Sequence, residues 1–231
     1  MRLDKYLSQL GIASRAACKD LIRRGAVTVN GSCHVKPELH VTEEDDIRVE
    51  GRPVVLEEFE YYVLNKPAGY LTAREDLHKK VVMELVPSSR RDLSPVGRLD
   101  EDTEGVLLIT NDGMLNHRLL RPDNHVAKKY LAKVDTPLPA DAKERLESPM
   151  DLKDFVTAGG SYEQVDAYSA YLTITEGKYH QVKRMFGALG CKVTELRRVS
   201  FGSLTCDDLD AGECRRLTEE ELRALKGEAE K

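Results

Sequence analysis

Residues 97–105 read Gly97-Arg98-Leu99-Asp100-Glu101-Asp102-Thr103-Glu104-Gly105. This segment separates two apolar runs, 93–96 and 106–109, and its bordering glycines predict a tight turn next to a strand. Such a turn holds the Asp100 carboxylate in a fixed place, with the cationic Arg98 two residues away. An aspartate in a turn often only accepts hydrogen bonds from backbone N–H groups. The turn alone therefore leaves a structural and a chemical role both open.

The chain around this turn predicts more strands than helices. An excess of strands with a few helices favours an α+β domain on a mainly antiparallel, mixed β-sheet with flanking helices. The strands are expected at 61–64, 106–109, 130–134 and 171–175, and the helices at 114–120, at 182–189 and after Thr218.

The first fifty residues predict a separate compact unit. Leucines recur at helical spacing between residues 3 and 10, and Ser14 is a typical N-cap for a second helix that ends near Gly25. The alternating residues 27–29 lead into Asn30-Gly31, the strongest short signal for a hairpin. A further strand is expected at 47–49. We place the boundary between residues 1–56 and 57–231, with a linker from Leu56 to Glu60.

Composition favours a cytoplasmic globular protein. The 231 residues include no apolar stretch near the ~20 needed to cross a bilayer. The polar N-terminus lacks the apolar core of a signal peptide, so we expect no membrane partner. The five cysteines form no C-x-x-C pair and the histidines have no ligand spacing, so we assign no metal site.

The net charge of −5 conceals two basic segments. Residues 1–36 carry seven Lys or Arg against two acidic residues, and residues 178–198 carry six against Glu195 alone. Attraction to a polyanion depends on where charge lies, so a nucleic-acid partner is compatible with an acidic chain. A solvated helix face would produce the same pattern, and charge alone does not separate the two interpretations.

The N-terminal unit resembles the S4 RNA-binding domain, a small fold of αL type. Its strings R-L-D-K-Y-L, G-I-A-S-R and L-I-R-R-G-A-V-T-V-N-G occur in the order and spacing of that domain. The resemblance implies that basic side chains of two helices contact the phosphates of structured RNA. The candidate RNA-binding residues in this unit are Arg2, Lys5, Arg15, Lys19, Arg23 and Arg24.

Four strings in the larger domain resemble the RsuA family of ribosomal RNA pseudouridine synthases. They are L-N-K-P-A-G from Leu64, G-R-L-D from Gly97, K-Y-L from Lys129 and G-K-Y-H-Q-V-K-R-M from Gly177. The resemblance runs from residue 1 to about residue 217 and includes the S4 domain. It implies an isomerase that breaks the N-glycosidic bond of a uridine, turns the base, and joins C5 to the same sugar carbon.

The resemblance also implies the catalytic residues. Asp100 is the nucleophile, a role that a carboxylate performs without a cofactor. A nearby cation favours its ionised form. That cation is Lys183 or the adjacent Arg184, and the sequence leaves both open.

Further roles follow from the same match. Tyr130 is expected to stack on the target base after it flips out of the RNA. Arg98 is expected to hold the flipped nucleotide and Lys66 to contact RNA phosphate, although a plain loop lysine fits Lys66 equally. His180 is expected to support the fold of the site.

The leading functional hypothesis is conversion of one uridine of small-subunit (16S) ribosomal RNA into pseudouridine. The enzyme is expected to act as a monomer, on free RNA or on a partly assembled small-subunit particle. The K-Y-H-Q-V-K-R form of the last string looks more like the small-subunit branch of the family. The alternatives are a large-subunit ribosomal RNA pseudouridine synthase and a non-catalytic RNA-binding or ribosome-assembly factor. A glycosidase with a second carboxylate as acid is a further option, but it leaves the basic segments unexplained.

Overall fold

The computed structural model describes residues 1–55 and 57–230, and the chain divides into two compact units. The first consists of Met1–Glu60 with Pro87–Leu93, and the second of Tyr61–Val86 with the chain from Ser94 onward. Leu56, where the predicted linker begins, and Lys231 lie outside the described residues. Within the described part of the chain, no helix is both long and apolar enough to cross a membrane.

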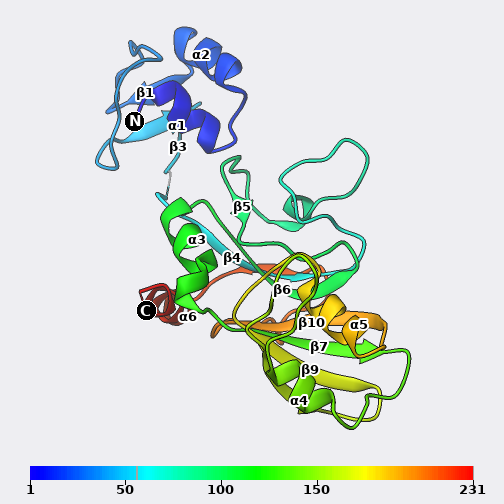
Figure 1. The fold of residues 1–231 in the computed structure, drawn as a ribbon. Helices are drawn as coiled ribbons and strands as arrows, with labels where there is room; N and C mark the ends of the chain where they lie inside the picture. The colour runs from blue at the N-terminus through cyan, green and yellow to red at the C-terminus, as the bar shows by residue number, and fades with distance from the viewer. Residues whose placement is uncertain (56, 231) are drawn as a thin grey trace. The chain divides into compact units, whose positions relative to one another are not determined.

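The first unit is built from two helices and a small sheet (Figure 1). Its core consists of apolar side chains from both helices and the sheet, including Leu3, Leu7, Ile22 and Ile47. The Ser14 side chain accepts a hydrogen bond from the Ala17 backbone N–H, so the predicted cap is confirmed. The elements are α1 (Leu3–Gln9), α2 (Arg15–Arg23), β1 (Val27–Val29), β2 (Ile47–Val49) and β3 (Arg52–Pro53).

The turn at Asn30-Gly31 forms, but the prediction of a hairpin directly across it is wrong. Both residues have positive φ, 52° and 82°, and Val29 makes one isolated bridge to Ser32. The strand that pairs with β1 is the more distant β2, in antiparallel register. The residues after Gly31 are mostly polar and include Pro37, so they lack the alternation that would sustain a second strand.

A short segment from later in the chain, residues 87–93, belongs to this first unit. The Ser89 hydroxyl donates to the Leu10 carbonyl at 2.7 Å, and the Gln9 amide donates to the Asp92 carboxylate at 3.3 Å. Gly11 has φ +74°, and a Cβ there would lie 2.0 Å from the Ser89 carbonyl oxygen. Only glycine permits both this backbone conformation and this close approach.

The second unit is an α+β domain on one mixed sheet, as the sequence predicts. The strand order is β11-β4-β6-β10-β7-β9-β8, with β5 paired to β6. Only the β6–β10 pairing is parallel among the described strands. The strands are β4 (Tyr61–Lys66), β5 (Ser94–Pro95), β6 (Thr103–Thr110), β7 (Lys128–Val134), β8 (Ser161–Gln164), β9 (Ser169–Ile174), β10 (Val193–Phe201) and β11 (Cys214–Arg216). The helices are α3 (Gly113–Leu120), α4 (Ala142–Glu147), α5 (Gln181–Ala188) and α6 (Glu219–Glu228), with short 3-10 turns η1 (Val82–Leu85) and η2 (Pro122–Asn124).

Helices α3 and α6 cover β4 and β6 in a shared core. Leu115 of α3 and Leu225 of α6 are buried against Val63 of β4 and Leu108 of β6. Thr218 caps α6 and exchanges hydrogen bonds with Glu221, which confirms the helix expected after Thr218. Helix α5, drawn in orange in Figure 1, lies beside β10. The core therefore fixes β6 and β10, the strands next to the Asp100 turn.

Strand β10 lies in a region for which the sequence predicted a basic segment but no strand. Its Arg198 is 2% exposed and donates from Nε to the Val106 carbonyl at 2.9 Å, with its guanidinium 5.1 Å from the Phe201 ring centroid. Arg198 is therefore part of the core, and its inclusion in a polyanion-binding segment was wrong.

Candidate active site

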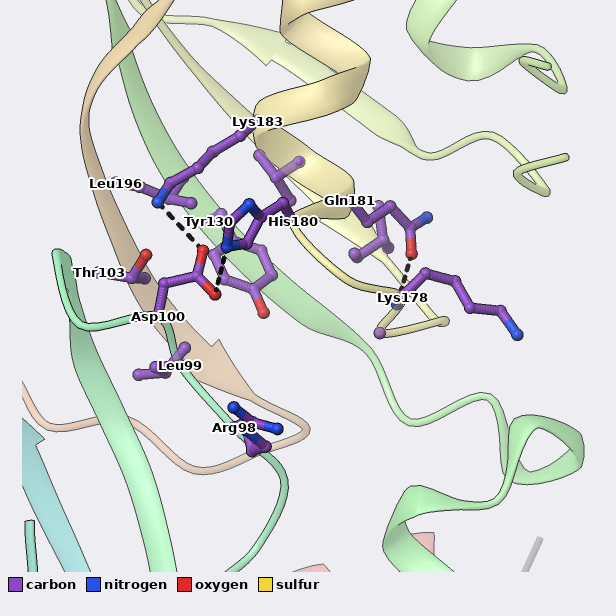
Figure 2. A pocket seen from close by; sticks show the side chains of 13 residues that line it. Arg98, Leu99, Asp100, Thr103, Tyr130, Lys178, His180, Gln181, Lys183 and Leu196 are labelled. Carbon is purple, nitrogen blue, oxygen red and sulfur yellow. Dashed lines mark hydrogen bonds and ion pairs between the residues drawn. The ribbon is translucent and has the colours of Figure 1, made fainter. Parts of the chain in front are cut away.

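Three strands and one helix meet at the Asp100 turn. Asp100 precedes β6, whose first residues pair in parallel with β10, and β10 pairs on its other side with β7, which carries Tyr130. The N-terminal end of α5 completes the site (Figure 2). The resulting pocket is open to solvent. Its lining includes Arg98, Asp100, Tyr130, Lys178, His180 and Lys183.

Lys66 at the end of β4 holds the backbone of this turn. Its ammonium group donates to the carbonyls of Thr103, Pro67 and Glu101 at 2.8, 3.1 and 3.2 Å, and the residue is fully buried. Burial lowers the pKa of Lys66 to about 8. A side chain in this position cannot reach phosphate, so the prediction that Lys66 contacts RNA is wrong.

A second set of bonds fixes the residues on either side of Asp100. The Thr72 hydroxyl donates to the Leu99 carbonyl at 2.7 Å and accepts from the Leu99 N–H at 3.2 Å. The Gly69 N–H donates to the Glu101 carbonyl at 2.8 Å. The Asp100 carboxylate thus projects from a backbone that is bonded before and after it.

The Asp100 carboxylate lies between two basic side chains, one at each oxygen. Lys183 Nζ is 3.0 Å from Oδ2, and His180 Nε2 is 3.3 Å from Oδ1. Figure 2 shows both side chains reaching Asp100 from α5 and its N-cap. A cation this close favours the ionised form of a carboxylate in a partly enclosed pocket.

The structure distinguishes the two candidate cations. Lys183 contacts Asp100, whereas the Arg184 guanidinium pairs with Asp154 and donates to the Leu152 carbonyl. Adjacent helical residues point about 100° apart, so only one of them can face the turn. The structure therefore does not bring Arg184 to Asp100, and that candidate assignment was wrong.

Lys183 is shared by two carboxylates of the turn. Its Nζ also lies 2.6 Å from Asp102 Oδ1. Burial alone would lower the pKa of Lys183, but the bonds to Asp102 and Asp100 outweigh burial and hold that pKa above its ordinary value. The same contact with Lys183 lowers the pKa of Asp102. Lys183 is therefore held in its charged form beside Asp100.

His180 has a more direct place in the site than the sequence indicates. Its backbone is left-handed, with φ 50° and ψ 30°, and this conformation starts α5 while directing the imidazole to Asp100. The position of this histidine in the G-K-Y-H-Q string is the sequence signal that marks it. Its ring also stacks on that of Tyr179, with centroids 3.8 Å apart and planes 19° apart.

Tyr130 and Arg98 complete the pocket. Tyr130 is 8% exposed and its ring lies behind Asp100 in Figure 2. Arg98 is exposed, and Figure 2 shows it on the other side of Asp100 from Lys183. The pocket thus offers a flat ring, a carboxylate and cations around one open space.

The predicted RNA-binding residues of the first unit fall into two groups. Arg2 and Arg15 both bind the buried Asp4, at 3.0 and 3.1 Å, and so join the starts of α1 and α2. Arg23 pairs with Asp20 on the surface of α2. Within the described residues, no ion pair holds Lys5, Lys19 or Arg24, and these three are available to an external anion.

Comparison with known proteins identifies both units. Residues 60–188 match the family model for RNA pseudouridylate synthase, and residues 1–47 match that for the S4 domain.

A Bacillus subtilis protein described as an uncharacterized RNA pseudouridine synthase is 42% identical, and the match covers 97% of this chain and 98% of that protein. The Escherichia coli ribosomal small subunit pseudouridine synthase A is 38% identical over 97% of this chain and all of its own. The Bacillus subtilis ribosomal large subunit pseudouridine synthase B is 36% identical over 99% and 97%. A crystal structure of a pseudouridylate synthase superposes with a TM-score of 0.69 at 35% identity, covering 97% of this chain and 99% of that one.

Proposed function

Because the chain belongs to the RNA pseudouridylate synthase family, we propose that it converts one uridine of small-subunit (16S) ribosomal RNA into pseudouridine, with Asp100 as nucleophile. The observation that carries the proposal is the Asp100 carboxylate, held between Lys183 and His180 at the wall of an open pocket. The S4 unit supports an RNA substrate. We further propose action as a monomer in the cytoplasm.

Each neighbour of Asp100 has a task in this reaction. Lys183 places its positive charge 3.0 Å from the carboxylate as the base closes the pocket and excludes water. The attack of the carboxylate on the nucleotide frees the uracil from its N-glycosidic bond, and Tyr130 supplies a flat surface on which the base turns. Carbon C5 of the base then bonds to the sugar carbon as the carbon–oxygen bond formed by Asp100 breaks, which restores the free carboxylate. The proton lost from C5 is balanced by one gained at N1, so the product is an isomer of the substrate. Arg98 at the pocket rim holds the flipped nucleotide in place.

The target base must flip out of the folded RNA before Asp100 can reach it. Flipping a nucleotide costs a few kcal/mol in lost stacking and pairing. Contacts between phosphates and the cations Lys5, Lys19 and Arg24, which form no ion pair within the described residues, offset that cost, and such contacts weaken as salt rises.

The relatives include enzymes for both ribosomal subunits, so either subunit is a candidate source of the uridine. The E. coli relative is a small-subunit enzyme, and the B. subtilis relative at 36% identity is a large-subunit enzyme. The K-Y-H-Q-V-K-R string from Lys178 favours the small subunit. Mapping pseudouridine across ribosomal RNA from cells with and without the gene tests the choice. Loss of a large-subunit site would replace our proposal by the second candidate.

Tritium release from RNA labelled at uridine C5 tests the chemistry. The full chain is expected to release tritium, and Asp100→Asn is expected to lower release to background, because the amide cannot act as the nucleophile. Binding of the same RNA is expected to survive. Arg184→Gln serves as a matched control that leaves the Lys183–Asp100 pair in place. Release by Asp100→Asn at the wild-type rate would refute the assignment, and binding without release by the wild type would favour a non-catalytic factor.

A further inference from the structure

The pocket has an exposed aromatic side chain immediately outside it. Tyr179 is 74% exposed, although its chain neighbours Lys178 and His180 both line the pocket. Tyr179 itself is not one of the described residues that line the pocket. A tyrosine this exposed beside an open pocket contributes little to the core and is available to a ligand.

The ring of Tyr179 is already held in place. One face stacks on His180, with centroids 3.8 Å apart and planes 19° apart, and His180 in turn lies 3.3 Å from Asp100. The loop that carries the ring is fixed through Gln181, which is 3% exposed. Its side chain accepts from the Lys178 N–H at 3.1 Å and donates to the Glu176 carboxylate at 2.5 Å.

A flat ring with one face covered and little freedom is suited to stacking. Every nucleobase has a π face, so stacking on an aromatic side chain is available to any sequence. Figure 2 shows the Lys178 side chain directed away from Asp100, on the outer side of the same loop. A cation next to an exposed aromatic ring is the combination that binds single-stranded RNA through base and phosphate together.

We propose that the face of Tyr179 opposite His180 stacks on the nucleobase adjacent to the target uridine. This inference rests on the proposed function, because it takes the base in the pocket to be a uridine of RNA. Stacking continues from the neighbouring base through Tyr179 to His180, the side chain that contacts Asp100. Tyr130 inside the pocket and Tyr179 outside it thus serve two successive nucleotides.

Binding of designed RNA strands by the full chain tests the proposal. The reference strand consists of abasic residues, and a second strand carries a single uridine that fixes the register in the pocket. Two further strands restore an adenine on the 5′ or the 3′ side of that uridine. Dissociation constants are measured by fluorescence anisotropy for the wild type, Tyr179→Phe and Tyr179→Ala.

Adenine on one side is expected to tighten binding by about 5- to 100-fold in the wild type and in Tyr179→Phe. Tyr179→Ala is expected to lose this gain while keeping the gain from uridine. An equal gain from adenine in the alanine variant, or no gain in the wild type, would overturn the stacking inference. Absence of any gain from uridine would instead contradict the proposed function, so the two failures are distinguishable. Unchanged thermal unfolding of both variants shows that the fold is intact.

Discussion

Asp102 and Asp100 bind the same ammonium group, and this sharing has a measurable effect. Both carboxylates raise the pKa of Lys183. Asp102→Asn removes one of them, so Lys183 is expected to lose its proton at lower pH. The alkaline limb of the kcat/KM profile for tritium release should therefore move to lower pH. Asp102→Glu, which keeps the charge, should leave the limb near its wild-type position. A limb that stays fixed or moves upward in Asp102→Asn would show that Asp102 does not tune Lys183.

Lys66 should matter for stability far more than an exposed lysine nearby. Lys66→Met removes the donor to three carbonyls and is expected to cost about 2–4 kcal/mol of unfolding free energy. Lys79→Met is the matched control, because its 2.6 Å pair with Glu101 is exposed and such surface pairs contribute little to stability. Urea denaturation compares the two variants. Equal losses would mean that the bonds of Lys66 do not hold the turn.

Some residue roles could be predicted from sequence and others could not. Matched strings placed Asp100, Tyr130 and Lys183 around one pocket. Sequence order could not choose between Lys183 and Arg184, because the phase of the helix relative to the turn is set by packing of Val182 and Phe186. Lys66 looked like a loop lysine because its acceptors, apart from Pro67, come from a turn some 35 residues away in the chain.

At the scale of elements, β6 approaches β10 through Gly105. Gly105 has φ +103°, and a Cβ there would lie 2.1 Å from the Arg198 carbonyl oxygen. Gly105→Ala is therefore expected to cost at least about 2–4 kcal/mol, since backbone rather than a flexible side chain would have to move. Gly113→Ala has no atom within 4 Å of its Cβ and should change stability by about 1 kcal/mol or less. Chemical denaturation measures both, and a mild Gly105→Ala would contradict the close approach.

The sequence predicted the strands that have apolar runs and missed the central strand that has charged residues. Strands β4 and β6 carry long apolar runs and were recognised, because both faces of a central strand are buried. Strand β10 is just as central, but its sequence V-T-E-L-R-R-V-S-F has charged residues in the middle. Its place in the sheet depends on backbone pairing to two neighbours and on burial of Arg198 over Phe201, which local periodicity does not reveal.

At the scale of the whole molecule, buried lysines make stability depend on pH. Burial lowers the pKa of Lys66 and of Lys128 to about 8, whereas an unfolded lysine titrates near 10.5. Above pH 8 the unfolded chain therefore binds more protons than the folded one, and stability rises with pH. The free energy of unfolding is expected to rise by about 1–2 kcal/mol between pH 8 and pH 9.

Buried thiols limit this rise at higher pH. Burial raises the pKa of Cys214 to about 12, so above pH 9 the folded chain retains a proton that the unfolded chain loses, and the contribution of this thiol to stability falls as pH rises. Urea denaturation at a series of pH values measures the sum. Lys66→Met should show a smaller rise from pH 8 to pH 9 than the wild type. An equal rise in both would mean that Lys66 is not the source.

The segment 87–93 has a consequence for the S4 unit as a portable module. The S4 match covers residues 1–47, yet the compact unit also takes in Ser89 and Asp92, which bond to Leu10 and Gln9. A fusion protein that borrowed only the N-terminal residues would lack these partners, and Gly11 would face solvent instead of the Ser89 carbonyl. A fragment that ends where the S4 match ends therefore does not contain the whole compact unit. A graft of this RNA-binding unit into another enzyme should therefore include a replacement for residues 87–93 that supplies the same two hydrogen bonds.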